Sequence, residues 1–264
     1  MKKFLAVTIT AAMALSFAAC ANKTEETAAT TAATTTAAAT EATEASEETE
    51  ATEATEATDP AAKSEGVMTY AEYAAADLDS EVVIEAYVQG KQSWWDDKAT
   101  VYLQDPDGAY FCYEMACSED DYALLVTGQK IKVTGFKSEW SGEIEITDAT
   151  FEIEDGSWIA EATDATALLG TDELIDLQNQ LVSFTDMTVV SVAFKNDQPG
   201  DDIYVTLSKD DAEYTFCLEY YLNGSDEAFY ELVSGLEEGQ TVDVEGFLYW
   251  YEGANTHLTS VTVK

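Results

Sequence analysis

The chain contains GQKIKVTGF at residues 128–136 and GQTVDVEGF at residues 239–247. A turn with Trp and Gly follows each run, with Trp140 and Gly142 in the first copy and Trp250 and Gly253 in the second. Alternating apolar and polar residues are typical of a half-buried strand, and two such runs around a Gly-containing turn are typical of a hairpin. The sequence therefore predicts an internal duplication of a β-hairpin.

Residues 1–19 have the pattern of a signal peptide, because Lys2 and Lys3 precede an apolar run that extends to Phe17. The residues that follow this run, through Ala18 and Ala19 to Cys20, resemble a bacterial lipobox, in which the signal is cut before a Cys that then carries the lipid. The resemblance implies a lipoprotein signal, a lipidated Cys20 and a membrane anchor at the outer, extracytoplasmic face of the cell membrane. An ordinary signal peptide with a chance cysteine is the alternative.

Residues 20–65 after the signal consist almost wholly of Ala, Thr and Glu, with repeats such as EATEAT at residues 53–58. Such a segment has few large apolar side chains to bury, so it cannot offset the entropy lost on ordering. We expect a disordered tether, which as a flexible coil would span about 40 Å.

The charge balance is strongly acidic. The formal net charge is −40, and residues 66–264 hold 41 Asp and Glu against eight Lys, with no Arg in the whole chain. Nucleic-acid binding depends on Lys and Arg that neutralise phosphates. The composition therefore argues against a nucleic-acid partner, and the acidity serves either solubility or the capture of cations.

The order of expected elements repeats along the chain. The first half has a short helix, three strands, a helix and the repeated hairpin, at residues 68–76, 82–88, 100–104, 110–115, 119–126 and 128–151. The second half has a helix, three strands, a helix and the second hairpin, at residues 171–177, 182–193, 203–207, 214–220, 225–233 and 239–263. Three strands, a helix and a final hairpin make up the OB-fold, a five-stranded Greek-key barrel.

The predicted fold class is mainly β, with two tandem five-stranded OB-fold barrels after the tether, each with a short helix between its third and fourth strands. The first barrel covers residues 66–153 and the second residues 171–264, with a linker at residues 154–170. This arrangement resembles the paired OB-fold domains of secreted Gram-positive lipoproteins. Element order and duplication carry the resemblance, and no catalytic signature accompanies it.

Few residues are suited to catalysis. His257 is the only histidine and is expected at an exposed strand position, so His-based triads and His-rich zinc sites lack their groups. Cys112, Cys117 and Cys217 are expected as free thiols, and no Asp cluster follows the calcium-loop pattern. We therefore predict a non-enzymatic protein without cofactor or metal.

Aromatic residues give the clearest indication of a binding site. OB-folds bind ligands with the face of strands two and three and with the loops between strands one and two and between strands four and five. Tyr102, Tyr110 and Cys112 are expected to face outward on strands two and three, with Phe111, Tyr113 and Met115 facing inward. The predicted ligand-binding residues are Trp94, Trp95, Tyr102, Tyr110, Trp140, Tyr204, Tyr249, Trp250 and Tyr251.

Flat rings beside carboxylates, without positive groups, suit a neutral polyol or a cell-wall saccharide. A saccharide-binding protein is therefore the first interpretation of the sequence. A protein-interaction or structural module, in which the aromatic residues pack between the domains or against a surface protein, is the alternative. A further alternative is a module that binds single-stranded nucleic acid, and the oligomeric state stays open.

Overall fold

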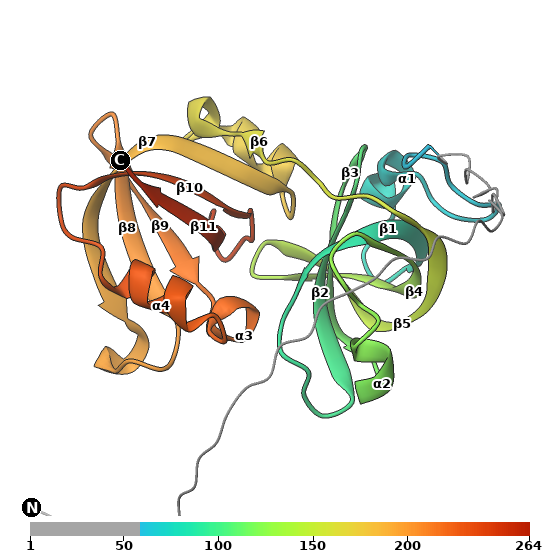
Figure 1. Cartoon of the computed structure of the whole chain (residues 1–264). Coiled ribbons are helices and arrows are strands. Elements are labelled where there is room, and N and C mark those ends of the chain that lie inside the picture. Colours follow the sequence, from blue (N-terminus) through green and yellow to red (C-terminus); the bar gives the residue numbers. More distant parts are fainter. Residues whose placement is uncertain (1–58) are drawn as a thin grey trace, which may run out of the picture. The chain divides into compact units, whose positions relative to one another are not determined.

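In the computed structural model, the structure describes residues 59–264, which form two β-sheets with short helices before or between their strands (Figure 1). The predicted signal peptide, the lipidation site Cys20 and most of the tether lie outside these residues. The prediction of a mainly β chain with two sheets is confirmed. No helix among residues 59–264 is long and apolar enough to cross a membrane.

The first sheet closes into a five-stranded barrel in the order β1-β2-β3-β5-β4. Its strands are β1 (Glu81–Lys91), β2 (Lys98–Asp105), β3 (Gly108–Ala116), β4 (Gln129–Trp140) and β5 (Glu143–Ser157). Helix α1 (Tyr70–Ala75) precedes the barrel and helix α2 (Glu119–Tyr122) connects β3 to β4. The predicted second helix is therefore shorter than expected, one turn capped by Ser118.

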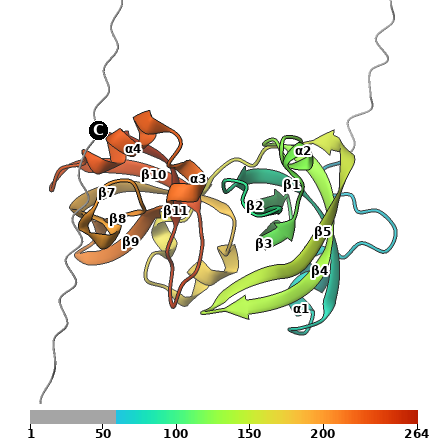
Figure 2. The same cartoon turned by 90° about the horizontal axis from the view of Figure 1, so that it is seen from below.

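Helix α1 lies against the barrel (Figure 2) and is fixed at both ends. Thr69 and Glu72 form a capping box at its start. At its end, the ammonium group of Lys137 on β4 donates to the carbonyl oxygens of Tyr73, Ala74 and Ala76 at 3.1, 2.8 and 2.9 Å. A buried lysine thus satisfies carbonyl groups that a helix end leaves unpaired.

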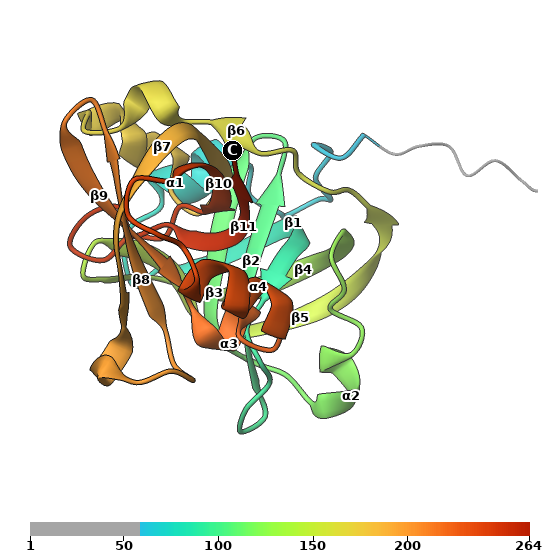
Figure 3. The same ribbon diagram turned by 60° about the vertical axis from the view of Figure 1, so that its left-hand side comes forward.

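The second sheet has six strands in the order β10-β11-β9-β8-β7-β6, with a further pairing between β10 and β7 (Figure 3). The strands are β6 (Thr163–Asp164), β7 (Leu181–Phe194), β8 (Ile203–Lys209), β9 (Ala212–Leu218), β10 (Thr241–Phe247) and β11 (His257–Val263). The sequence predicted five strands here. The sixth, β6, lies in the expected linker and pairs in parallel with the start of β7.

Short helices complete the second half of the chain. They are the 3₁₀-helices η1 (Thr166–Leu168), η2 (Asp172–Leu177) and η3 (Lys195–Asp197), and the α-helices α3 (Tyr220–Asn223) and α4 (Glu227–Ser234). The helix expected at residues 171–177 is therefore a 3₁₀-helix. Helix α3 was not expected, because the predicted strand ends at Tyr220 and the next predicted helix begins at residue 225. Glu219 caps α3 by accepting from the backbone N–H of Leu222.

Strand β3 does not keep the alternation that the sequence suggested. Tyr110 and Cys112 belong to the barrel core, so the prediction that they face outward is wrong, and Tyr113, expected inside, is exposed. Glu114 has a φ of 49°, and the register between β2 and β3 shifts beside it, which returns Met115 to the core. Such a β-bulge changes the face of every following side chain, and an alternating pattern does not reveal it.

The two sheets contact each other through aromatic side chains. Tyr102 on β2 stacks on Phe247 of β10, with ring centroids 4.3 Å apart and planes at 9°. The Tyr102 hydroxyl also shares a hydrogen bond of 2.7 Å with Nδ1 of His257 on β11. His257 is buried, so its prediction as an exposed residue is wrong, and burial lowers its pKa to about 3. The histidine is therefore a neutral part of the contact.

The duplicated hairpins meet in the same contact through their tips. The carboxylate of Glu143, at the start of β5, accepts from the backbone N–H of Trp250 at 2.8 Å and from the amide of Gln178 at 3.2 Å. Its other oxygen, Oε1, is buried without a hydrogen-bond partner among the described residues. Burial raises the pKa of Glu143 to about 8. Burial in this contact therefore favours the protonated form of the Glu143 carboxyl group at neutral pH.

Candidate binding groove

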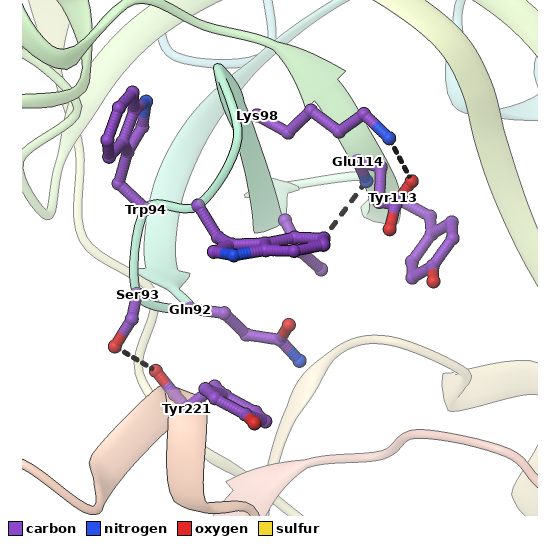
Figure 4. A pocket seen from close by; sticks show the side chains of 9 residues that line it. Gln92, Ser93, Trp94, Lys98, Tyr113, Glu114 and Tyr221 are labelled. Carbon is purple, nitrogen blue, oxygen red and sulfur yellow. Dashed lines mark hydrogen bonds and ion pairs between the residues drawn. The ribbon is translucent and has the colours of Figure 1, made fainter.

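An open groove lies where the loop between β1 and β2 meets the outer face of β2 and β3 (Figure 4). Its volume is about 430 Å³. Its lining comes from both halves of the chain and consists of Gln92, Ser93, Trp94, Trp95, Lys98, Thr100, Tyr113, Glu114 and Tyr221. We call it the β1–β2 groove.

A tight two-residue turn positions Trp95 over this groove. Trp95 and Lys98 exchange backbone hydrogen bonds of 3.2 and 3.0 Å, and the residues between them, Asp96 and Asp97, have φ values of 51° and 57°. A two-residue hairpin turn with positive φ at both central residues matches the twist of the strands that it joins, and Asp tolerates a positive φ. The turn is therefore well defined, although the Trp95 side chain at its start is 70% exposed.

The neighbouring Trp94 has a different role. Its indole N–H donates to the carbonyl oxygen of Cys117 at 2.8 Å, and its ring is half-buried. The backbone N–H of Cys117 in turn donates to the carbonyl oxygen of Asp97 at 2.9 Å. Trp94 therefore fastens the loop to the end of β3, which leaves Trp95 as the exposed ring.

The floor of the groove is formed by β2 and β3. Lys98 and Glu114 form an ion pair of 2.6 Å there, both partly exposed, and hydrogen bonding to Glu114 raises the pKa of Lys98. The backbone N–H of Glu114, freed by the bulge, donates to the hydroxyl of Thr100 at 3.1 Å. Lys98 is the only cation in the lining, and it is already paired with Glu114. Tyr113, which also lines the groove, is 43% exposed.

The opposite wall comes from the second half of the chain. Ser93 donates to the carbonyl oxygen of Tyr221 on α3 with its backbone N–H at 2.7 Å and with its hydroxyl at 3.1 Å. The Tyr221 ring is 59% exposed. Trp95, Tyr113 and Tyr221 thus place three large exposed rings around one groove, which is a common mark of a binding surface.

The predicted site residues do not form a single surface. Trp94 and Trp95 line the β1–β2 groove, and Tyr102 and Tyr110 are fully buried. Tyr249 stacks on His257 within the contact between the sheets, with centroids 4.4 Å apart. The other predicted residues lie around the hairpin tips or on β8: Trp140 contacts Tyr251, with centroids at 5.1 Å, and Tyr204, Trp250 and Tyr251 line a second groove.

Sequence reasoning missed Tyr113 and Tyr221 as groove residues. Tyr113 was assigned to the core, because the bulge at Glu114 could not be foreseen. Tyr221 is far from the first barrel in sequence and reaches the groove only through the packing of α3. A cluster of adjacent tyrosines at Tyr220 and Tyr221 was the one available indication, and it does not say which surface they join.

Other reactive groups of the described residues lie away from the groove opening. Cys112, Cys117 and Cys217 are buried and free, and burial raises the pKa of Cys112 to about 12 and that of Cys117 to about 11. Among residues 59–264, no three His, Cys, Asp or Glu side chains gather in a way that could hold a metal ion. These thiols are therefore packing residues at neutral pH.

No protein-family model and no curated protein matches the chain. Among solved structures, it is similar to a murine DNA-binding protein bound to double-stranded DNA, with a TM-score of 0.35, 11% identity, and coverage of 69% of this chain and 94% of that chain. It is also similar to a replication protein A heterotrimer bound to single-stranded DNA, with a TM-score of 0.32, 14% identity, and coverage of 72% and 51%.

Two predictions are corrected by these findings. The two similar structures are DNA-bound, which stands against the prediction of a saccharide ligand and against the prediction that a nucleic-acid partner is unlikely. The burial of Tyr102 and Tyr110 also removes the continuous aromatic face that the saccharide interpretation required. With TM-scores of 0.32 to 0.35, what those proteins bind gives no partner to this chain.

Proposed function

We propose that this chain is a lipid-anchored, extracytoplasmic module with two OB-fold barrels, which binds a basic segment of a partner protein in the β1–β2 groove. The observation that carries the proposal is the gathering of three exposed rings, Trp95, Tyr113 and Tyr221, around a groove whose only cation is already paired. The proposed role is binding, without catalysis.

Charge supports a basic occupant. Asp96 and Asp97 are exposed at the rim of the groove, and Glu114 lies on its floor. Residues 66–264 as a whole hold 41 Asp and Glu against eight Lys. This distribution attracts cations and accelerates their association at low ionic strength.

Aromatic chemistry supports the same occupant. Arg and Lys side chains are attracted to the faces of Trp and Tyr rings, by about 0.5–1 kcal/mol per contact at exposed sites and about 2 kcal/mol when water is excluded. Arg also forms paired hydrogen bonds with carboxylates such as Glu114. A segment with two or three basic residues could use the rings and the carboxylates together.

The position of the groove supports the OB-fold assignment of the first barrel. OB-folds bind with the loop between strands one and two and with the face of strands two and three. The β1–β2 groove is built from these parts, since Trp95 belongs to that loop and Tyr113 to β3. The order of the sequence elements and the apparent lipobox at Cys20 support the anchored, extracytoplasmic placement.

The test is a fluorescence and calorimetric titration of the full chain with the peptide Gly-Arg-Gly-Arg-Gly-Arg-Gly at low salt. We expect saturable binding that weakens as salt is added. Trp95→Ala should weaken it about fivefold, which corresponds to about 1 kcal/mol. Trp140→Ala removes another exposed tryptophan, which lies outside the groove, and should leave the affinity unchanged.

Two further probes make the test decisive. The same peptide with Glu in place of Arg should not bind, because its charges repel the carboxylates. An octamer of deoxythymidine represents single-stranded nucleic acid. Binding of the octamer in preference to the Arg peptide, or equal loss of peptide binding in Trp95→Ala and Trp140→Ala, would overturn the proposal.

A further inference from the structure

A second groove lies on the outer face of β8 and β9, and we call it the β8–β9 groove. Its volume is about 730 Å³ and it is wide open to solvent. Four rings line it, those of Tyr204, Tyr214, Trp250 and Tyr251. Glu213 is the only charged residue in its lining, and Tyr204 is 36% exposed.

The β8–β9 groove lies on the outer face of two paired strands of the second sheet. The corresponding face of the first barrel, on β2 and β3, is already covered by the second half of the chain. β8 and β9 follow β7 and pair with each other, as β2 and β3 follow β1 and pair with each other. Tyr204 lies five residues before Lys209 at the β8–β9 turn and Tyr102 three residues before Asp105 at the β2–β3 turn, so the two tyrosines share a face of their strands but not a register position. Tyr102 and Tyr204 both lie outside the core cluster of their own sheet.

The covered β2–β3 face shows which kind of side chain such a surface binds. Tyr102 holds the ring of Phe247 in a stacked arrangement at 4.3 Å, and Phe111 packs edge-on against Tyr249 at 5.4 Å. Leu181 and Leu222 from the second half complete this contact. The β2–β3 face of the first barrel therefore already binds an aromatic side chain from a strand of the same molecule.

We propose that the β8–β9 groove is a second docking site, which takes an aromatic side chain of a partner protein onto Tyr204 as Tyr102 takes Phe247. The flanking residues of that partner should be basic, because Glu213 is the only charge in the lining and the surrounding sheet is acidic. This site is distinct from the β1–β2 groove, so the inference does not rest on the proposed function.

Trp250 ties this groove to the rest of the molecule. Its backbone N–H is bound by the carboxylate of Glu143, and its indole packs near Gly142, where a Cβ atom would approach to 2.8 Å of the ring. Both residues belong to the hairpin tip of the first barrel. The groove is therefore held in place by the first half of the chain, which gives an aromatic guest a preformed wall.

The experiment follows amide resonances of the isotopically labelled full chain during addition of two peptides, Gly-Lys-Phe-Lys-Gly and Gly-Lys-Leu-Lys-Gly. The two peptides carry the same charges. They should therefore make the same charge-dependent contacts, including those in the β1–β2 groove. We expect saturable shifts at Tyr204, Thr215 and Trp250 with the Phe peptide, and affinity there at least about threefold lower with the Leu peptide.

Matched variants separate this site from the other groove. Tyr204→Ala should weaken the Phe peptide at these amides about threefold or more, and Tyr204→Phe should retain it, since the ring and not the hydroxyl makes the contact. Tyr113→Ala removes a comparably exposed tyrosine of the β1–β2 groove and should have no effect here.

Equal response to the Phe and Leu peptides, or unchanged binding in Tyr204→Ala, would overturn the inference. Shifts of the same amides with protein concentration alone would show that a second copy of the chain occupies the groove, and would overturn the choice of partner. Failure of Arg-peptide binding in the β1–β2 groove would leave these outcomes unaffected, because the two readouts use different residues.

Discussion

Replacement of Glu143 by Gln should change how stability depends on pH. The native pKa of Glu143 is raised to about 8 by burial, against an ordinary value of 4.5. Between these values the native state keeps the proton and the unfolded state has lost it. The native state then binds more protons, so the free energy of unfolding falls as pH rises from 4.5 to 8.

The size of the effect follows from the shift. Each pKa unit corresponds to about 1.4 kcal/mol, so the three units between pH 5 and pH 8 give a loss of about 4 kcal/mol in the wild type. Gln keeps an oxygen that can accept from the backbone N–H of Trp250 but carries no proton to lose. The difference in unfolding free energy, wild type minus Glu143→Gln, should therefore fall by about 4 kcal/mol between pH 5 and pH 8.

Chemical denaturation followed by tryptophan fluorescence, repeated in half-unit steps from pH 5 to pH 8.5, measures this difference. The subtraction removes the contribution of His257, whose lowered pKa acts in the opposite sense by reducing stability as pH falls below 6.5. Glu139→Gln, which removes an exposed carboxylate of β4, is the control and should give a flat difference. A flat difference for Glu143→Gln would refute the reasoning, because it would mean that Glu143 is ionised in the native contact.

Three further changes test other parts of the structure. Tyr102→Phe should destabilise the chain by about 1–2 kcal/mol in thermal unfolding, because Nδ1 of His257 loses its buried hydrogen-bond partner. An unchanged unfolding free energy would mean that this hydrogen bond makes no net contribution to stability. Lys137→Met should leave the carbonyl groups of Ala74 and Ala76 without their partner, cost about 1–3 kcal/mol and accelerate hydrogen exchange in α1. Unchanged exchange would contradict the capping role. Lys98→Ala should leave the unfolding free energy nearly unchanged because its ion pair is exposed, yet raise the affinity for the Arg peptide about threefold by freeing Glu114. A lower affinity would show that Lys98 is part of the binding surface.

Local patterns predicted most elements of the fold. The repeated Gly-Gln to Gly-Phe runs form antiparallel hairpins, and α1 lies within the short helix expected at residues 68–76. These features depend on residues close in sequence, and local sequence determines them. Element order also gave the two sheets, because a chain of short strands with one helix before each hairpin has few ways to pair.

Features that depend on contacts distant in sequence were not predictable. The face of Tyr113 changed because one bulge at Glu114 shifts the strand, and no residue type marks that bulge. His257 looked exposed by alternation, but the partner that covers it, Tyr102, is 155 residues away. The candidate groove was found only in part for the same reason, since Tyr221 reaches it through packing between the two halves.

The contact between the two sheets also bears on how separate molecules of this chain meet. The hairpin of the second half docks on the β2–β3 face of the first, so the two copies use different surfaces. A contact of this kind can continue from molecule to molecule and build an open filament. The hairpin of the first half carries Phe136 at the place of Phe247, and Phe136 is 43% exposed.

The neighbours of these two rings differ. Phe247 is paired with Leu181 and His257, whereas Phe136 is paired with Glu81 and Thr147. A charged and a hydroxylated neighbour replace an apolar and an aromatic one, which makes the strands around Phe136 a poor copy of those around Phe247. Divergence between the two copies therefore disfavours docking of the first hairpin on the β2–β3 face of another molecule, and with it an open filament.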